Sequence, residues 1–547
     1  MKYGPFTRKK QVPNQTGKPA VLLIMPILFL LYLAFLVFLA GNTEGGTYTA
    51  TKHAAEADRA VIGATVPYTT KGHCGHCHEQ HASIDGSEPA PPSEEGPSMY
   101  LLFRSNYGAT RNEACFACHE SLNLVGMPLG YGREGIYQGK DKYENSVHDA
   151  SLQMLWSPDP APPGPLYHDQ GNCNNCHNPH GYGDGQGVIP QMLFAREEAL
   201  CEACHDGTQG GFTKDVKAQL NKPYSHPAHA HTGRHALPET GQPSGSSFGP
   251  ESRHAECVDC HNPHTLGGSV HTVPGNTVSE ILQNVWGVEP SWPSGWTQPI
   301  TFTATRPPLY PDGSEFEYQI CFKCHSYYGL GIVTEGVSTI TGPSNAAITD
   351  QAWEFNPNNG SAHPVVTALS NMNGSGFPRA LAFDQMLEPW TDVGNQTMYC
   401  SDCHGADNED TTGAKGPHGS NSKYMLKGTG KYWPAKSDGI TLWSLNQADA
   451  QNTNLFCRNC HPLFSDPLNQ GNPTWKNNVH AVGSHQNTNC VTCHVAVPHG
   501  SRAGRLIGYA DLPAPYDYND NSLRITSFSK TDPFSYQKIN CATECHQ

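Results

Sequence analysis

The chain has little of what most globular enzymes and nucleic-acid-binding proteins use. Hydrophobic residues make up 37% of its 547 residues, and 55 Gly and 44 Pro interrupt nearly every segment. The 34 Lys and Arg are outnumbered by 49 Asp and Glu, and the formal net charge of −15 argues against nucleic acid as a partner. The sequence has no glycine-rich phosphate loop and no catalytic serine constellation, so no catalytic residue is predicted.

Cysteine occurs in this chain only in pairs. The 20 cysteines form ten pairs, and each pair is followed at once by a histidine. Nine pairs have the spacing Cys-x-x-Cys-His, and they are Cys74/Cys77/His78, Cys115/Cys118/His119, Cys173/Cys176/His177, Cys201/Cys204/His205, Cys257/Cys260/His261, Cys321/Cys324/His325, Cys400/Cys403/His404, Cys457/Cys460/His461 and Cys490/Cys493/His494. The tenth, Cys541/Cys545/His546, has one extra residue between its cysteines.

This spacing is typical of covalent haem attachment. Two thiols add to the two vinyl groups of one porphyrin, and the adjacent imidazole becomes the proximal ligand of the iron. A zinc protein would leave some cysteine pairs without a histidine, and a disulfide scaffold would not fix a histidine after every second cysteine. The sequence therefore predicts ten covalently bound haem c groups, one at each motif. The widened last motif is the least typical, and its alternative is an orphan cysteine pair in an exported protein.

The haems change how the composition is interpreted. Taken alone, the low hydrophobic content would suggest disorder, but each haem adds a large apolar disc bonded to the chain. We expect a mostly irregular fold, in which short helices over the haem motifs and a few short strands wrap around a stacked haem chain. Residues 300–303 and 523–526 are candidate strands. Trp286, Trp292 and Trp296 are expected to pack against porphyrin, with a docking surface as the alternative.

The N-terminal residues predict a membrane segment. Residues 20–40 contain no charged side chain and no histidine, and as a helix they are long enough to cross a hydrocarbon core. Residues 1–19 carry basic and no acidic side chains, which places them in the cytoplasm by the positive-inside rule. We expect residues 41–70 to be a linker and residues 71–547 to be an exported decahaem domain, anchored at the periplasmic or cell-surface face. The alternative is a cleaved signal peptide and secretion.

The haem motifs alternate with two further histidine signals. A serine-histidine segment, replaced once by Asn-Val-His, follows motifs two, four, six and eight, and a proline-histidine segment follows motifs three, five, seven and nine. This alternation defines four two-haem units, each with a first and a second motif. The units span about residues 111–190, 197–268, 317–420 and 453–502, and a terminal haem motif follows at 541–546.

The recurrent histidines can fill the open side of each iron. Ten proximal histidines leave ten axial positions open, and 29 histidines in all leave 19 to fill them. The predicted distal ligands are His148, His180, His226, His264, His363, His418, His480 and His499, with His53 and His81 as candidates for the first haem. Spacing does not determine which histidine serves which haem. The histidines more typical of buffering or supporting roles near a haem are His168, His229, His231, His235, His254, His271 and His485.

The alternation of Cys-x-x-Cys-His, Ser-x-His and Cys-x-x-Cys-His-x-Pro-His resembles the doubled-motif multihaem c-type cytochromes of metal-reducing bacteria. The stretches 318–325 (YQICFKCH) and 490–500 (CVTCHVAVPHG) are similar to sequences of that group, and the resemblance extends over about residues 70–547. It implies bis-histidine haems stacked in a chain that moves electrons through the periplasm or out to extracellular acceptors such as metal oxides. The widened last motif and the retained N-terminal segment depart from the secreted members.

Two imidazoles on each iron leave no coordination site for a substrate, so such haems pass electrons onward. The predicted function is therefore electron transfer. Without a histidine, residues 20–40 cannot hold a haem in the bilayer, so the donor must be a quinol-oxidising membrane complex or a small cytochrome. One alternative is a subunit that self-assembles into an extracellular filament. The other is a multihaem reductase with one five-coordinate haem, although all ten motifs end in His and none in Lys.

We expect the purified, haem-loaded exported domain to contain ten haems, all of them low-spin. A redox titration followed by EPR counts the haems and reports any high-spin iron. A high-spin signal would favour the reductase. Mass spectrometry that found no covalent porphyrin on the mature chain would contradict the haem assignment as a whole.

Overall fold

The structure is a computed structural model. It describes residues 78, 115, 143–149, 173–183, 189–195, 197–208, 214–229, 254–305, 314–331, 333–341, 347–369, 381, 385–407, 414–444, 454–462, 485, 488–509, 511–517, 525–528 and 541–542. Residues 176–183 and 189–195 belong to a small compact unit, and the others belong to a large one. The predicted segments 1–19, 20–40 and 41–70 lie outside the described residues, among which no helix is long and apolar enough to span a membrane.

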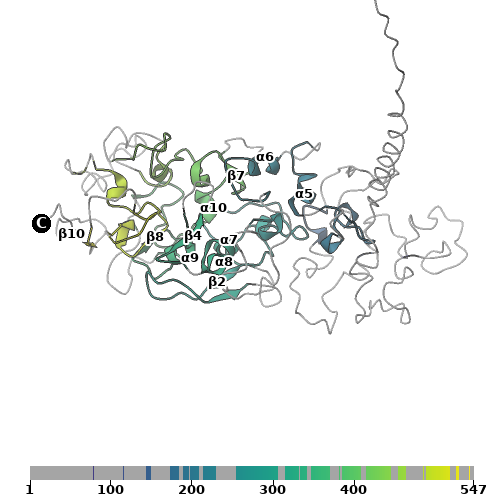
Figure 1. Cartoon of the computed structure of the whole chain (residues 1–547), viewed down its shortest axis with the longest axis horizontal. Coiled ribbons are helices and arrows are strands. Elements are labelled where there is room, and N and C mark those ends of the chain that lie inside the picture. Colours follow the sequence, from purple (N-terminus) through teal and green to yellow (C-terminus); the bar gives the residue numbers. More distant parts are fainter. Residues whose placement is uncertain are drawn as a thin grey trace, which may run out of the picture. The chain divides into compact units, whose positions relative to one another are not determined.

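Helices are short and separated by irregular chain (Figure 1). The α-helices are α5 (Glu197–Glu202), α6 (Val216–Leu220), α7 (Glu317–His325), α8 (Tyr327–Leu330), α9 (Gln351–Glu354) and α10 (Cys400–Cys403). The 3₁₀ helices are η4 (Cys173–Asn175), η5 (Pro190–Met192), η6 (Cys257–Asp259), η7 (Glu280–Leu282), η9 (Lys423–Met425), η10 (Phe456–Asn459), η13 (Cys490–Thr492) and η14 (Gly504–Leu506). Many of these turns cover the cysteines of a motif, which confirms the prediction of short helices there.

The longest of these helices, α7, shows how a motif is held. It begins where the side-chain oxygen of Gln319 accepts the backbone N–H groups of Glu315 at 2.9 Å and Phe316 at 3.1 Å. It ends at His325 because Ser326 takes an extended conformation and caps α8, its hydroxyl accepting the N–H of Tyr328 at 3.2 Å. Both ends are therefore fixed around the motif.

The strands form five two-stranded antiparallel pairs. These pairs are β1 (Tyr224–Ser225) with β7 (Gly419–Ser420), β2 (Val288–Pro290) with β3 (Phe302–Ala304), β4 (Val337–Thr341) with β5 (Ala347–Thr349), β6 (Ser361–Ala362) with β8 (Gly500–Ser501), and β9 (Ser527–Phe528) with β10 (Cys541–Ala542). The candidate strand at 300–303 is found as β3. The second candidate is displaced, because the described end of 523–526 is irregular and the strand there is β9.

Two of these pairs join a serine-histidine segment to the proline-histidine segment of the next two-haem unit. In one, Ser225 lies opposite Gly419, and the N–H of His226 donates to the carbonyl of His418 at 3.1 Å. In the other, Ala362 lies opposite Gly500, and His363 donates to His499 at 2.9 Å. We call each such pair a histidine clip. The clips set two histidines from different units on neighbouring strands.

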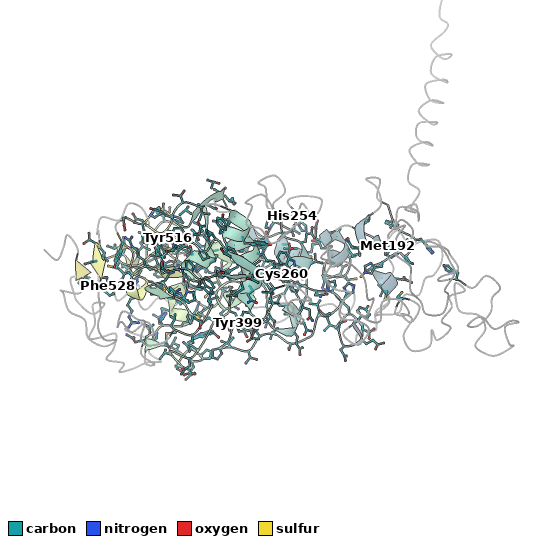
Figure 2. The ribbon with its side chains drawn as sticks, turned by 90° about the horizontal axis from the view of Figure 1, so that it is seen from below. Met192, His254, Cys260, Tyr399, Tyr516 and Phe528 are labelled. Atoms are coloured by element: carbon teal, nitrogen blue, oxygen red, sulfur yellow. The ribbon has the colours of Figure 1, made fainter. Side chains whose placement is uncertain are left out.

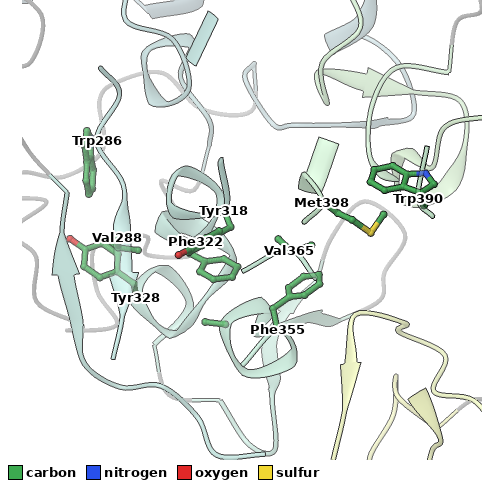
Figure 3. Packing of buried hydrophobic residues seen from close by; sticks show 10 residues of the cluster. Trp286, Val288, Tyr318, Phe322, Tyr328, Phe355, Val365, Trp390 and Met398 are labelled. Carbon is green, nitrogen blue, oxygen red and sulfur yellow. The ribbon is translucent and has the colours of Figure 1, made fainter. Parts of the chain in front are cut away.

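A hydrophobic core forms between the sixth motif and the segments before and after it (Figure 3). Phe322 of α7 and Val288 of β2 are both 0% exposed and pack in one cluster with Trp286. Trp292 stands edge-on to Phe322 with ring centroids 6.3 Å apart, and Trp296 lies 5.7 Å from Trp353. The three tryptophans therefore pack against other aromatic side chains. Trp286 is buried, and Trp292 and Trp296 are half-buried.

A second cluster links the last two Cys-x-x-Cys-His motifs. Trp443 and Val491 are each 1% exposed, and the cluster is bordered by Cys457 and Cys490. The indole N–H of Trp433 donates to the carbonyl of Ala496 at 2.9 Å, which ties this cluster to the segment behind the ninth motif. Side chains are packed along the large unit, where Cys260, Tyr399 and Tyr516 are labelled in Figure 2. Protein side chains thus supply part of the core that was expected from porphyrin alone.

Gly500, in the clip formed by β6 and β8, has no room for a side chain. A Cβ there would collide with the backbone oxygen of Glu354, whereas a Cβ on Gly508 would find its nearest neighbour, the backbone nitrogen of Val495, at 3.5 Å. We expect Gly500→Ala to lower the free energy of unfolding by about 1–3 kcal/mol and Gly508→Ala to leave it nearly unchanged. Thermal unfolding of the two variants gives the comparison, and equal melting temperatures would contradict the tight packing of the clip.

Candidate haem sites

Histidines from distant parts of the large unit lie opposite one another in pairs. Each pair combines the histidine of a Cys-x-x-Cys-His motif with a histidine from a serine-histidine or proline-histidine segment. The ring centroids are 6.4 Å apart for His205 with His148, 6.1 Å for His325 with His226, 6.0 Å for His261 with His418, and 6.0 Å for His404 with His499.

This separation suits a metal ion between the rings. Metal–imidazole bonds are about 2 Å long and the ligating nitrogen lies roughly 1 Å from the ring centroid, so two imidazoles on one metal have centroids roughly 6 Å apart. His461 is also an electrostatic neighbour of His363. Burial lowers the pKa of His363 to about 4, and the neighbouring charge of His461 is the next largest cause. The residues present therefore fit ligation from both sides.

The hydrogen bonds of the rings leave the correct nitrogen available. Nδ1 is the hydrogen-bonded atom in nine histidines of the motifs and of the two segments, namely His148, His177, His226, His261, His363, His404, His461, His494 and His499. In eight of them the partner is a backbone carbonyl, which only accepts, so Nδ1 carries the proton and Nε2 keeps its lone pair. Such bonds orient metal-ligating histidines.

Three histidines that were not predicted as ligands are arranged the opposite way. The Nε2 atom of His229 contacts the carboxylate of Glu202, that of His254 lies 3.5 Å from Glu256, and that of His271 lies 3.4 Å from Asp402. Their Nε2 atoms are therefore directed at carboxylates. This agrees with a supporting role for these side chains.

Left-handed turns provide several of the carbonyl acceptors. His404 donates to Tyr424 at 2.7 Å and His494 donates to Arg505 at 3.1 Å. Tyr424 has φ 61° and Arg505 has φ 62°, and the residue after each also has positive φ. Non-glycine residues adopt this conformation at a cost of about 1–2 kcal/mol each, and such cost is usually found where a function depends on it. The small unit repeats the turn, where His177 donates to Gln191, φ 56°.

Sequence reasoning missed these turns. Their signal is a weak recurrence of two adjacent apolar residues, Met192-Leu193, Met425-Leu426 and Leu506-Ile507, at variable distances after a motif. The second residue of each apolar pair forms a β-bridge with the proximal histidine, for example Leu426 with His404. The recurrence is detectable only once the bridges are known.

Burial keeps the paired imidazoles neutral. Desolvation, aided by nearby histidines, lowers the pKa of both His325 and His418 to about 3, and it lowers the pKa of both His205 and His404 to about 4. A neutral imidazole is the form that binds a metal. These residues are therefore in the ligating state at neutral pH.

The cysteines of three two-haem units also meet. The first cysteines of the two motifs form a hydrogen-bonding contact in three units, Cys115 with Cys173, Cys201 with Cys257 and Cys321 with Cys400. The Sγ atoms of Cys321 and Cys400 and a carboxylate oxygen of Glu317 lie within 4.8 Å of one another. Glu317 is already engaged, because it accepts the backbone and hydroxyl groups of Ser401 at 2.8 Å each and so ties α10 to α7.

Contacts between successive units involve other cysteines. Cys260, at the end of one unit, interacts electrostatically with Cys321 of the next, and Cys403 does so with Cys460. Along the chain, the attachment residues of motif four are thus near those of motif five, and the same relation holds step by step up to motif eight. The spatial order of these motifs follows their sequence order.

The second cysteines of four motifs are placed by the local structure around them. They are Cys176, Cys204, Cys324 and Cys493. Cys176 is exposed, whereas the other three are half-buried, and its carbonyl accepts the N–H of Phe194 at 3.1 Å. Cys324 lies in the last turn of α7, and Cys493 packs against the cluster around Ile525. Attachment of haem to these four thiols, as to the other cysteines of the motifs, stays a prediction.

The remaining predicted site residues lie partly outside the described residues. Cys74, Cys77, Cys118, Cys545, His53, His81, His119, His480 and His546 lie outside the described residues, and only the backbone of Cys541 is described. His78 is half-buried. In the small unit the N–H of His180 donates to the side-chain oxygen of Asn178 at 3.0 Å, and His264 of the large unit donates to Asn262 at 3.2 Å.

Comparison with known proteins gives one match. The family model described as a doubled CXXCH motif matches residues 168–210, which contain the third and fourth motifs. None of the curated proteins and none of the solved structures compared with the chain matches it. The family match supports a haem-binding protein similar to c-type cytochromes, with covalently bound haem c. It spans the second motif of one unit and the first motif of the next.

The left-handed turn at Tyr424 gives a direct test of its cost. Tyr424 is 40% exposed, so Tyr424→Gly and Tyr424→Ala remove similar contacts, but only glycine adopts positive φ freely. We expect the glycine variant to be more stable than the alanine variant by about 1 kcal/mol, measured by thermal unfolding. An alanine variant of equal or greater stability would show that the turn is not strained.

Proposed function

We propose that the chain is a decahaem electron-transfer cytochrome whose irons are ligated by histidine on both sides. The observation that carries the proposal is the set of opposed histidines with centroids 6.0 to 6.4 Å apart, each pair containing one motif histidine. The match to a doubled CXXCH motif supports multihaem c-type chemistry. When bound, the haem irons supply one-electron oxidation and reduction.

The ligands are exchanged between two-haem units in a regular way. A serine-histidine segment serves the first motif of the next unit, as His148 does for His205, His226 for His325 and His363 for His461. A proline-histidine segment serves the second motif of the preceding unit, as His418 does for His261 and His499 for His404. No described pair lies within one unit. The two-haem unit is therefore a repeat of the sequence, and each iron bridges two successive repeats.

The chain's own residues do three things in this proposal. The paired imidazoles occupy both axial positions, which leaves no place for a substrate. Burial keeps the rings neutral and surrounds the centres with a medium of low polarity. Carbonyl acceptors on Nδ1 orient six of the paired rings, those of His148, His226, His261, His363, His404 and His461. Together these features favour electron relay over catalysis.

The two kinds of contact between motifs define a path. Inside a unit the first cysteines touch, so the thioether-bearing edges of the two porphyrins would be adjacent. Between units, each histidine clip holds a ligand of one motif beside a ligand of the following motif, as His418 and His226 do for motifs five and six. Electrons would thus pass from motif to motif in chain order.

The donor in this proposal follows from the N-terminal segment. We infer a donor that is a quinol-oxidising membrane complex or a small cytochrome, because residues 20–40 contain no histidine that could ligate a haem within the bilayer. The acceptor is periplasmic or extracellular, metal oxides included. The N-terminal segment anchors the cytochrome on the outer side of the membrane that it crosses.

Carbon monoxide binding to the reduced, haem-loaded protein tests the ligation. The wild-type protein is expected to bind none, because both axial positions of each iron are filled. His418→Ala opens one haem. His261→Ala opens or removes that same haem, so the double variant is expected to show no more CO-reactive haems than His418→Ala alone. Haems are counted from the change in the Soret band.

A matched double variant provides the control. His404 belongs to the same two-haem unit as His418 but faces a different histidine, so His404→Ala combined with His418→Ala is expected to give two altered haems. The reverse pattern, additive for His261 with His418 and non-additive for His404 with His418, would show that ligands stay within a unit. Carbon monoxide binding by the wild type would contradict the relay and favour a reductase.

A further inference from the structure

One buried carboxylate contacts a predicted ligand. Glu354, the last residue of α9, is 0% exposed. One of its carboxylate oxygens lies 2.5 Å from Nδ1 of His499, and the other accepts the hydroxyl of Tyr516 at 2.7 Å. Its main-chain carbonyl is held by the side-chain amide of Asn359 at 2.8 Å. The carboxylate is therefore fixed on the outer side of the imidazole, and Nε2 of His499 faces His404.

This arrangement differs from the other hydrogen-bonded histidines. Among the nine described ligand candidates with an Nδ1 hydrogen bond, His499 alone has a carboxylate as its partner. His363, on the other strand of the same clip, donates to the carbonyl of Pro498 at 2.6 Å. Within the described residues Glu354 has no Lys or Arg ion-pair partner. Its described side-chain partners are therefore this imidazole and the hydroxyl of Tyr516.

The preceding clip provides an internal comparison. A Cβ on Gly500 would meet the backbone oxygen of Glu354, and a Cβ on Gly419 would meet the backbone oxygen of Gln219. Glu354 and Gln219 therefore occupy equivalent places beside the two clips. Gln219 is 7% exposed, and neither its side-chain oxygen nor Nδ1 of His418 makes a hydrogen bond to a described residue. One clip thus carries a neutral amide where the other carries a carboxylate.

A carboxylate behind an axial imidazole increases the electron density that the ring gives to the metal. Axial ligation and hydrogen bonding to the ligand are among the factors that set a haem potential. A more basic imidazole stabilises the ferric state, because that state carries one more positive charge. The one-electron reduction at this centre is then less favourable than at a centre without the carboxylate.

We propose that Glu354 is a positioning residue that lowers the reduction potential of the haem held between His404 and His499, relative to the haem held between His261 and His418. This rests on the proposed function, since it requires a haem at each of those pairs. The haem of the seventh motif then has a lower reduction potential than the haem of the fifth motif. Electrons passing in chain order must cross both.

The test is Glu354→Gln in the full, haem-loaded protein. Glutamine keeps the shape and reproduces the residue found at the equivalent place, Gln219, so the fold is expected to be retained. A potentiometric titration followed by absorption and EPR should show one haem moved to higher potential, with the number of low-spin haems unchanged. Tyr516→Phe, which keeps the carboxylate, should produce no upward shift.

The outcomes separate this inference from the proposed function. A Glu354→Gln titration that superimposes on the wild type, while all haems remain low-spin, would overturn the role of Glu354 alone. A shift to lower potential would overturn it as well. To locate the affected haem, His499→Ala is added: the shift caused by Glu354→Gln should disappear in that background, and its persistence would contradict the assignment. If His404 and His499 altered different haems in the carbon monoxide assay, the ligation itself would be wrong.

Discussion

The short antiparallel contact between a serine-histidine segment and the proline-histidine segment of the next unit is the constraint on which the rest of this structure depends. Each histidine clip consists of two residues per strand, yet it brings two histidines together. The carbonyls of Pro417 and Pro498 in the proline-histidine segments also accept from Nδ1 of the opposite histidines, His226 and His363. His226 and His418 therefore face in different directions, toward His325 and His261. A small amount of regular structure can position many ligands in this way.

The clips also explain why so irregular a chain has a defined interior. Strands and helices of two to nine residues cannot be stable in isolation. They are held by long-range contacts, such as the tie between Glu317 and Ser401 and the aromatic cluster around Phe322. In the proposed holoprotein the covalent haems add apolar surface to these contacts. Aromatic packing and cofactor then share the role that a continuous hydrophobic core has in an ordinary domain.

Much of the site could be predicted from the sequence because its chemistry is local. Attachment needs two thiols and an imidazole within five residues, so the motif at Cys400 is visible at once. The repeat also singled out His418 and His499 as ligand candidates. Their partners were not predictable, because strand pairing over more than a hundred residues decides them. Glu354 was missed for the same reason: its contact with His499 spans 145 positions, and no local pattern marks it.

The expected fold class was confirmed in its coarse form, mostly irregular with short helices and strands. The tryptophans near 290 were harder to place, because burial against porphyrin and burial against Phe322 produce the same apolar sequence signal. The left-handed turns were invisible for a different reason. Tyr424 and Arg505 belong to residue types that rarely adopt positive φ, so propensity argues against the conformation that the ligand carbonyl requires.

The exchange of histidines between successive repeats has a consequence for how such a chain can change its length. In the proposed ligation, a repeat that is copied in place gives one histidine forward and one backward and receives two in return, so every iron would keep both partners. Deletion of one whole repeat inside the series likewise leaves the number of histidines for each iron unchanged. Cutting the series at a boundary is different, because it strips one ligand from an iron on either side of the cut. The number of repeats can thus increase by internal duplication without loss of a ligand. The motifs at the two ends of the series need ligands from outside the repeats.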